Sequence, residues 1–165
     1  MRGVDEGRGG MLWCRHETPV GAVVLAARED GALTHLQFAE RFSPPETWRQ
    51  ETFPFEDVRR QLDDYFEGRR QTFQMPLAPR GTEFQRRVWG ALRNIPHGET
   101  ITYGALARRV GKPGAARAVG QANGANPIAI IIPCHRVVAA SGIGGYGGGL
   151  AIKRRLLALE GVLLE

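Results

Sequence analysis

The chain has 165 residues, of which 42% are hydrophobic, and its formal net charge is +5. This is enough apolar material for one sizeable core or two small ones. No apolar run approaches the roughly 18 residues that a membrane span needs, so the sequence favours a cytoplasmic protein without a membrane partner. Residues 1–10 contain no apolar stretch of the kind found in secretory signals, and we expect a short flexible leader there.

The charge is divided unevenly along the chain. Residues 1–81 carry 11 Lys/Arg and 13 Asp/Glu, whereas residues 82–165 carry 11 and 4, and residues 100–159 contain no acidic residue. A surface of this kind suits DNA, because each neutralised phosphate releases condensed counterions. A basic face that serves solubility alone fits the charge equally well. The basic residues of this stretch are Arg108, Arg109, Lys112, Arg117, Arg136, Lys153, Arg154 and Arg155.

The first half is predicted to be a small sheet with one helix. Three short segments have strand character, and they are residues 12–17, 21–28 and 32–39. Turns are expected at residues 19–21 and at Asp30-Gly31, since Asp-Gly is a strong hairpin signal. After a proline-rich link at residues 43–45, the apolar spacing from Phe55 to Gly68 predicts a helix. An extended stretch at residues 74–80 leads to a domain boundary near residue 80, which separates domains of residues 11–80 and 81–165.

The second half opens with a helix signal. Thr82 is a candidate N-cap, and Gln85 three residues later completes a capping box. The predicted buried stripe that follows consists of Phe84, Val88, Trp89 and Leu92. Pro96 stops the helix.

Two further short helices are predicted over residues 102–110 and 115–122. The glycine-containing turn of residues 111–114 joins them into a helix-turn-helix pattern, although any pair of antiparallel helices gives the same pattern. Residues 128–132 are predicted to be a buried strand, and residues 150–160 a final helix.

Cys134 is the residue with the clearest chemical potential. It stands between Pro133 and the pair His135-Arg136, and nearby positive charge favours the reactive thiolate. His135 can accept the thiol proton, and Glu160 is the natural carboxylate to hold the other ring nitrogen. The pair alone also fits a structural cysteine in a core. The second cysteine, Cys14, has no partners at metal-ligand spacing, so no metal site is expected.

Two segments suit a nucleic-acid ligand. Residues 141–149 hold six glycines, which let backbone N–H groups approach a flat ligand, and Tyr146 among them can form a pocket wall. The helix of residues 115–122 has small side chains, so that Arg117 can reach into a groove or fill a gap in the base stack. A flexible loop and a solvated arginine are the alternatives.

Several of these motifs together resemble the O6-alkylguanine-DNA alkyltransferases. The resemblance extends from about Thr82 to Glu160. Its motifs are Pro133-Cys134-His135-Arg136-Val137, Ala116-Arg117-Ala118-Val119-Gly120, Asn126-Pro127, Gly145-Tyr146-Gly147-Gly148-Gly149 and Glu160. It implies an α/β N-terminal domain with a ribonuclease-H-like fold, a small antiparallel sheet plus helix. A mainly helical C-terminal domain with a winged helix-turn-helix-like DNA-binding motif follows.

The implied function is direct-reversal DNA repair. The alkyl group of O6-alkylguanine, and of O4-alkylthymine, in double-stranded DNA is transferred irreversibly to Cys134. The protein binds the minor groove, and the alkylated base is flipped out of the stack. The protein reacts once, as a monomer and without a cofactor; cooperativity on DNA is left open.

The resemblance also implies roles for single residues. His135, through a water, and Glu160 generate the thiolate of Cys134. Asn126 organises the hydrogen bonds around it, and Tyr103 crowds a DNA phosphate and donates a proton toward the guanine ring.

The remaining roles concern DNA and the base. Arg117 fills the vacated space in the duplex, and the other implied DNA contacts are Ala116, Ala118, Gly120 and Arg136. The carbonyl groups of Cys134 and Val137 read the exocyclic amine, while the pocket is lined by Tyr146, Gly147 and Gly148. Gly147 replaces a serine that many members carry.

Two alternatives remain at this stage. One is a hydrolytic enzyme with a Cys134-His135-Glu160 triad, which would turn over. The other is a lesion-binding protein without repair activity, a class that lacks the reactive cysteine.

Overall fold

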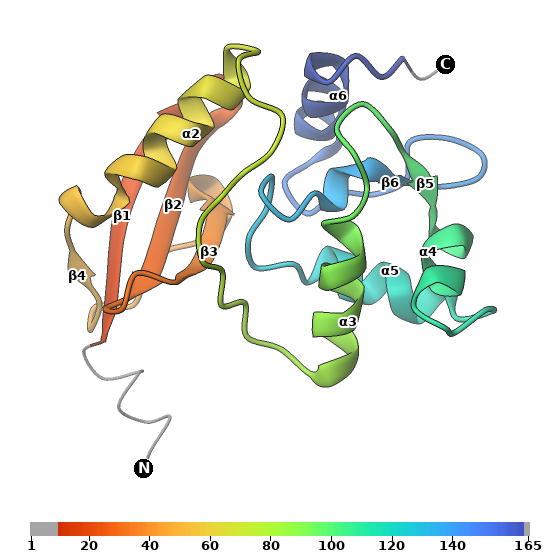
Figure 1. Cartoon of the computed structure of the whole chain (residues 1–165), viewed down its shortest axis with the longest axis horizontal. Coiled ribbons are helices and arrows are strands. Elements are labelled where there is room, and N and C mark those ends of the chain that lie inside the picture. The colour runs from red at the N-terminus through yellow and green to blue at the C-terminus, as the bar shows by residue number, and fades with distance from the viewer. Residues whose placement is uncertain (1–9, 164–165) are drawn as a thin grey trace. The chain divides into compact units, whose positions relative to one another are not determined.

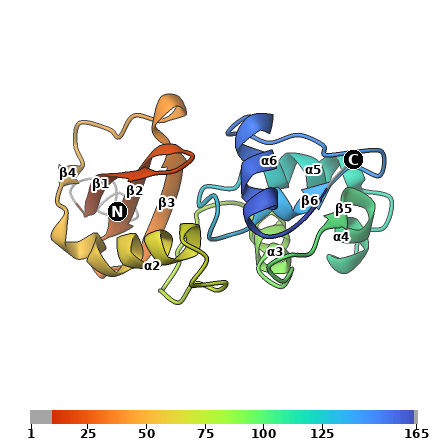
Figure 2. The same cartoon turned by 90° about the horizontal axis from the view of Figure 1, so that it is seen from above.

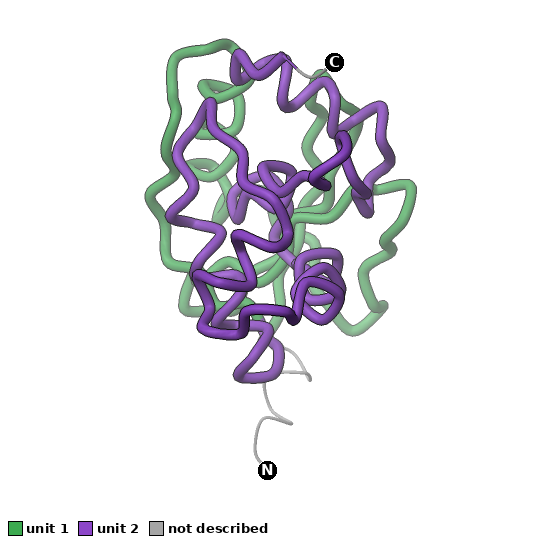
Figure 3. The backbone as a smooth tube through the Cα atoms, turned by 90° about the vertical axis from the view of Figure 1, so that its right-hand side faces the viewer, with its two compact units in different colours: residues 1–79 green, residues 80–165 purple. Residues whose placement is uncertain are grey.

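The computed structural model describes residues 10–163, which form two compact units divided between residues 79 and 80 (Figure 3). Apart from residue 10, the predicted leader lies outside the described residues. Within the described part, no helix is long and apolar enough to cross a membrane.

The first unit is a four-stranded sheet with a helix on it (Figures 1 and 2). Its strands are β1 (Met11–Thr18), β2 (Gly21–Arg28), β3 (Leu33–Phe38) and β4 (Arg49–Gln50), in the order β3-β2-β1-β4. The three predicted strands pair antiparallel, as expected, and Gly31 between β2 and β3 has the positive φ of 94° that its turn needs. The parallel strand β4 was not predicted, because two residues are too few for a periodic pattern.

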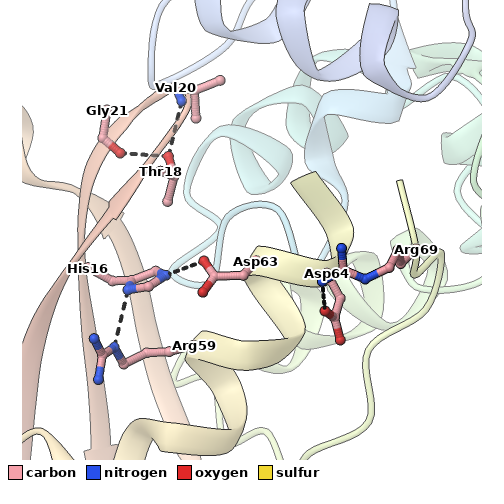
Figure 4. Close-up of polar contacts among 8 residues, drawn as sticks. All are labelled: His16, Thr18, Val20, Gly21, Arg59, Asp63, Asp64 and Arg69. Atoms are coloured by element: carbon pink, nitrogen blue, oxygen red, sulfur yellow. Dashed lines mark hydrogen bonds and ion pairs between the residues drawn. The ribbon is translucent and has the colours of Figure 1, made fainter. Parts of the chain in front are cut away.

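The helix of this unit is α2 (Glu56–Phe66), which follows the 3-10 turns η1 (Ala39–Arg41) and η2 (Phe53–Phe55). The predicted helix is confirmed, and Val58, Leu62 and Tyr65 form its buried stripe. A polar link joins it to β1 (Figure 4): His16 Nε2 donates to Asp63 Oδ1 at 2.8 Å, and Arg59 Nε donates to His16 Nδ1 at 3.2 Å.

The second unit is mainly helical. Its helices are α3 (Glu83–Leu92), α4 (Tyr103–Arg109), α5 (Ala116–Gly124) and α6 (Leu150–Leu159), and the strands β5 (Ile101–Thr102) and β6 (Val137–Val138) pair in parallel. The predicted capping box of Thr82 and Gln85 is confirmed at the start of α3. Of the predicted stripe, only Phe84 is not fully buried, because it lies in the first turn of the helix.

The predicted helix-turn-helix is confirmed as α4 and α5. Thr102 caps α4, since its Oγ1 accepts from the Ala105 N–H at 3.1 Å. The turn between the helices contains Gly111 and Gly114, both with positive φ. The two helices pack on each other, and α5 also packs on α3.

The predicted strand at residues 128–132 is wrong. All five residues are buried, but Ile128 forms only an isolated bridge, and a turn over residues 129–131 and a bend at Ile132 follow it. Ile131 N–H donates to Ala129 O at 2.8 Å around Ile130, whose φ is 72°, which is a strained γ-turn for a β-branched residue. Asn126 holds the segment, since its Oδ1 accepts from Ile128 N–H at 3.0 Å and its Nδ2 donates to Ile132 O at 2.8 Å. An apolar run does not reveal such a side-chain partner.

Candidate functional site

Cys134 lies at the start of a tight buried turn. Pro133 centres an inverse γ-turn in which Cys134 N–H donates to Ile132 O at 2.8 Å. The 3-10 turn η3 (Cys134–Arg136) follows, and Val137 N–H donates back to Cys134 O. Asn123 from α5 donates to the same oxygen from Nδ2 at 3.3 Å. Cys134 itself is 7% exposed, so the thiol is held by its backbone at the edge of the interior.

The next two residues converge on Glu160 at the C-terminal end of α6. His135 Nε2 donates to Glu160 Oε2 at 2.8 Å, and Arg136 donates to both carboxylate oxygens at 2.8 and 2.9 Å. Arg136 also donates to Ile95 O at 2.7 Å. Because the carboxylate already faces a bidentate guanidinium, its charge is balanced before His135 is counted.

This arrangement favours a neutral imidazole at His135. The side chain is 0% exposed, and burial lowers the pKa of His135 despite the opposing hydrogen bond to Glu160. With the proton on Nε2, the lone pair lies on Nδ1, which has no hydrogen-bond partner within residues 10–163. The structure therefore presents a neutral base next to the thiol in the chain.

Opposing effects act on the pKa of the Cys134 thiol. Burial raises the pKa of the Cys134 thiol, while a hydrogen bond from Asn126 and the positive charge of Lys153 lower it. Burial has the larger effect, so the thiol stays protonated without help from a base. Lys153 is the buried cation that acts on this thiol, and His135 is the next residue in the chain.

Lys153 corrects the sequence interpretation. It was counted among the basic surface residues, but its side chain is completely buried, and Nζ donates to Val137 O at 2.7 Å and to Gly145 O at 2.8 Å. Burial lowers the pKa of Lys153 to about 8. Helical spacing could have revealed this, because Lys153 shares the buried face of α6 with Leu156, Leu157 and Glu160.

Arg136 also differs from the expectation. A DNA contact was expected, but the side chain is buried and its guanidinium is occupied by Glu160 and Ile95. Its role in this structure is therefore internal, as the partner of Glu160. Of the basic stretch, the residues that are exposed are Arg108, Arg109, Lys112, Arg117, Arg154 and Arg155.

The expected DNA-contacting residues of α5 lie in its N-terminal half. Arg117 and Ala118 are exposed, while Ala116 and Gly120 are partly exposed. The buried side of the same helix carries Asn123, which reaches the Cys134 turn. The helix α5 therefore carries both the exposed Arg117 and Asn123, which hydrogen bonds to the backbone of Cys134.

Tyr103 lies between α5 and the glycine-rich loop. A Cβ on Gly120 would lie 3.6 Å from the Tyr103 ring, and one on Gly144 would lie 3.1 Å from its hydroxyl oxygen. Gly144 also has a φ of 78°, so only glycine fits there without strain. In the same loop, Tyr146 and Gly148 are partly exposed and Gly147 is exposed.

Metal-ligating groups do not gather here. Among residues 10–163 there is no group of three His, Cys, Asp or Glu side chains able to hold a metal ion. Both cysteines, Cys14 and Cys134, are free and buried.

Two family models match the chain and together span nearly all of it. Residues 11–79 match the model described as "6-O-methylguanine DNA methyltransferase, ribonuclease-like domain". Residues 83–162 match "6-O-methylguanine DNA methyltransferase, DNA binding domain".

Individual proteins give the same similarity. A "Methylated-DNA--protein-cysteine methyltransferase" of Methanosarcina acetivorans is 48% identical over 92% of this chain and 99% of its own length. One of Mycolicibacterium paratuberculosis is 52% identical over 87% and 88%. A crystal structure of Mycobacterium tuberculosis OGT in complex with DNA superposes with a TM-score of 0.85 at 48% identity, covering 90% of this chain and 92% of the other.

Proposed function

The chain belongs to the 6-O-methylguanine DNA methyltransferase family, and from this membership we propose how its residues perform the family's reaction. It is a direct-reversal DNA-repair enzyme that transfers the alkyl group of O6-alkylguanine in DNA to a cysteine. We assign this cysteine to Cys134. DNA is its partner, and because the substrate is genomic DNA and both thiols are free, we place the protein in the cytoplasm.

The observation that carries the assignment is the neutral imidazole of His135, the residue that follows Cys134 in the chain. Glu160 Oε2 accepts a hydrogen bond from His135 Nε2 at 2.8 Å and so keeps the imidazole proton on Nε2. This leaves Nδ1 to accept the thiol proton through a water. Arg136 balances the carboxylate, so His135 remains a base near neutral pH. At the second cysteine, burial raises the pKa of Cys14 to about 11 although the charge of Arg59 acts against it.

The proposed transfer is a displacement at the alkyl carbon. The Cys134 sulfur forms a bond to this carbon while the bond from carbon to O6 breaks, and guanine leaves. The thiol proton passes through a water to His135, and Tyr103 donates a proton toward the guanine ring. A thioether does not hydrolyse under these conditions, so each molecule reacts once.

Asn126 supports the reaction by holding the strained turn before Cys134. It fixes Ile128 and Ile132 on both sides of Ile130, and its amide also hydrogen bonds to the thiol and lowers the pKa of Cys134. The same side chain therefore shapes the backbone and favours the thiolate.

We propose that the N-terminal half of α5 binds DNA in the minor groove. Its small residues Ala116, Ala118 and Gly120 let the backbone approach the duplex, and Arg117 replaces the flipped base. The exposure of Arg117 supports this role. The base then enters between η3 and the glycine-rich loop of residues 141–149. There the carbonyl groups of Cys134 and Val137 accept hydrogen bonds from the exocyclic amine. The residues proposed to line this site are Tyr146, Gly147 and Gly148.

A stoichiometry measurement tests the function. A duplex carrying O6-methylguanine with a labelled methyl group is incubated in excess with the protein. We expect label on protein to reach one methyl per molecule and then stop, and Cys134→Ser to take up none. Continued turnover, or the hydrolysis of esters or amides by this protein, would contradict the proposal and favour a hydrolytic triad.

A further inference from the structure

Two buried side-chain donors hold the carbonyl groups of the first residue of η3, Cys134, and of the residue that follows η3, Val137. Asn123 Nδ2 from α5 donates to Cys134 O at 3.3 Å. Lys153 Nζ from α6 donates to Val137 O at 2.7 Å and to Gly145 O at 2.8 Å. These donors come from different helices, yet they act on the two carbonyl groups that the proposed function assigns to the exocyclic amine of guanine.

Both side chains are costly to bury. Asn123 is 4% exposed, and its Oδ1 has no hydrogen-bond partner in the described part of the chain. Lys153 is completely buried, and its partners there are backbone carbonyl groups rather than a carboxylate. An apolar side chain would avoid these desolvation costs. What the amide and the ammonium provide in return is a fixed direction for each carbonyl.

The position of Lys153 adds a second constraint. Its two acceptors belong to the strand β6 and to the glycine-rich loop, so one ammonium joins both segments. The loop contains Gly144 with its positive φ and Gly145 beside it. Glycine-rich backbone has much conformational freedom to lose, and a hydrogen bond from a buried cation restricts it.

We propose that Asn123 and Lys153 are positioning residues that fix the two amine-reading carbonyl groups and thereby set the preference for guanine over a base without the exocyclic amine. This rests on the proposed function, because that function supplies the base and the two acceptors. In this proposal neither residue contacts the alkyl group.

The test compares two methylated bases that differ only in this amine. Single-turnover methyl transfer to Cys134 is measured with duplexes containing O6-methylguanine or O6-methylhypoxanthine. Both substrates use the same thiol, so any change in its ionisation cancels in the ratio of the two rates. Wild-type protein is expected to prefer the guanine substrate.

Asn123→Leu is the first variant, because it keeps the approximate volume and removes a buried amide with an unsatisfied oxygen, a change expected to be tolerated. Its preference for guanine should fall roughly 3- to 10-fold, the equivalent of one neutral hydrogen bond, through a slower reaction with O6-methylguanine alone. Lys153→Met should reduce the ratio in the same direction. Arg117→Ala is the matched control, since it should slow both substrates equally.

The outcomes are distinguishable. If the wild-type protein reacts equally with both bases, or if both variants slow the two reactions by the same factor, the proposal is overturned. If wild-type protein methylates Cys134 with neither substrate, the proposed function itself fails. A circular dichroism melt of each variant shows whether it is folded, and the Asn123→Leu ratio decides the question if Lys153→Met is unfolded.

Discussion

The substitution Glu160→Gln removes one charge from the centre of the reaction network. In the structure, the Glu160 carboxylate accepts one hydrogen bond from His135 and two from Arg136, all between 2.8 and 2.9 Å. Both partners are buried. The neutral amide leaves Arg136 buried without an anion, and breaking a buried pair in this way costs about 3–5 kcal/mol. This is a large part of the roughly 5–15 kcal/mol that stabilises a typical protein.

The same change should slow alkyl transfer. His135 loses the carboxylate that fixes its tautomer, and positioned general bases contribute about 10²–10⁴ in rate. We therefore expect at least a roughly 100-fold slower single-turnover transfer.

Two measurements check these values. Urea-dependent hydrogen exchange of peptides from α3 and α6 gives the free energy of unfolding of the unit that holds the site, and quench-flow gives the transfer rate. Glu99→Gln is the matched control, because Glu99 is exposed and should change stability by less than about 0.5 kcal/mol. An unchanged unfolding free energy together with an unchanged transfer rate in Glu160→Gln would refute the reasoning.

Four other expectations follow from single contacts. Cys14 should stay unlabelled by iodoacetamide in the folded protein at pH 8, because its pKa of about 11 leaves almost no thiolate; peptide mass spectrometry reads this directly, and rapid labelling would contradict it. Thr82→Ala should lower the free energy of unfolding by about 1 kcal/mol, through loss of the N-cap, as measured by the same exchange experiment. Lys153 has a folded pKa of about 8, below its usual 10.5, so the unfolded chain binds more protons between these values. The contribution of Lys153 to the stability of the second unit should therefore rise by roughly 3 kcal/mol through this window. It is measured as the difference between wild type and Lys153→Met in urea titrations, because the raised pKa of Cys134 acts in the opposite sense in both proteins. Arg117→Ala should weaken duplex binding in a fluorescence anisotropy titration but leave the reaction with free O6-benzylguanine base unchanged.

The helix cap, the hairpin and the helix α2 could be predicted because each depends on residues that lie close together in the sequence. The capping box at Thr82 joins residues three positions apart, and the hairpin at Gly31 depends on one residue with positive φ. The helix α2 needs only its apolar stripe. Such signals lie within one segment, so the sequence carries them without reference to the rest of the structure.

Long-range polar contacts could not be predicted in the same way. The resemblance implied a DNA contact for Arg136, and only the fold brings Glu160 to its guanidinium. Lys153 differs, because its helical spacing with Leu156 and Leu157 already indicated the buried face of α6, and only its carbonyl partners depend on the fold. The turns at residues 128–132 depend on the amide of Asn126, which takes the place of a neighbouring strand. For Arg136 and for residues 128–132 a polar partner decides the structure, and apolar spacing does not reveal it.

The central claim is that Cys134 is the acceptor of the alkyl group. The direct measurement is the mass of the peptide containing Cys134 after incubation with a duplex carrying O6-methylguanine. The account predicts a gain of one methylene on this peptide, in proportion to the guanine restored, and no gain on the peptide containing Cys14. Restored guanine with an unmodified Cys134, or demethylation that persists in Cys134→Ser, would contradict it.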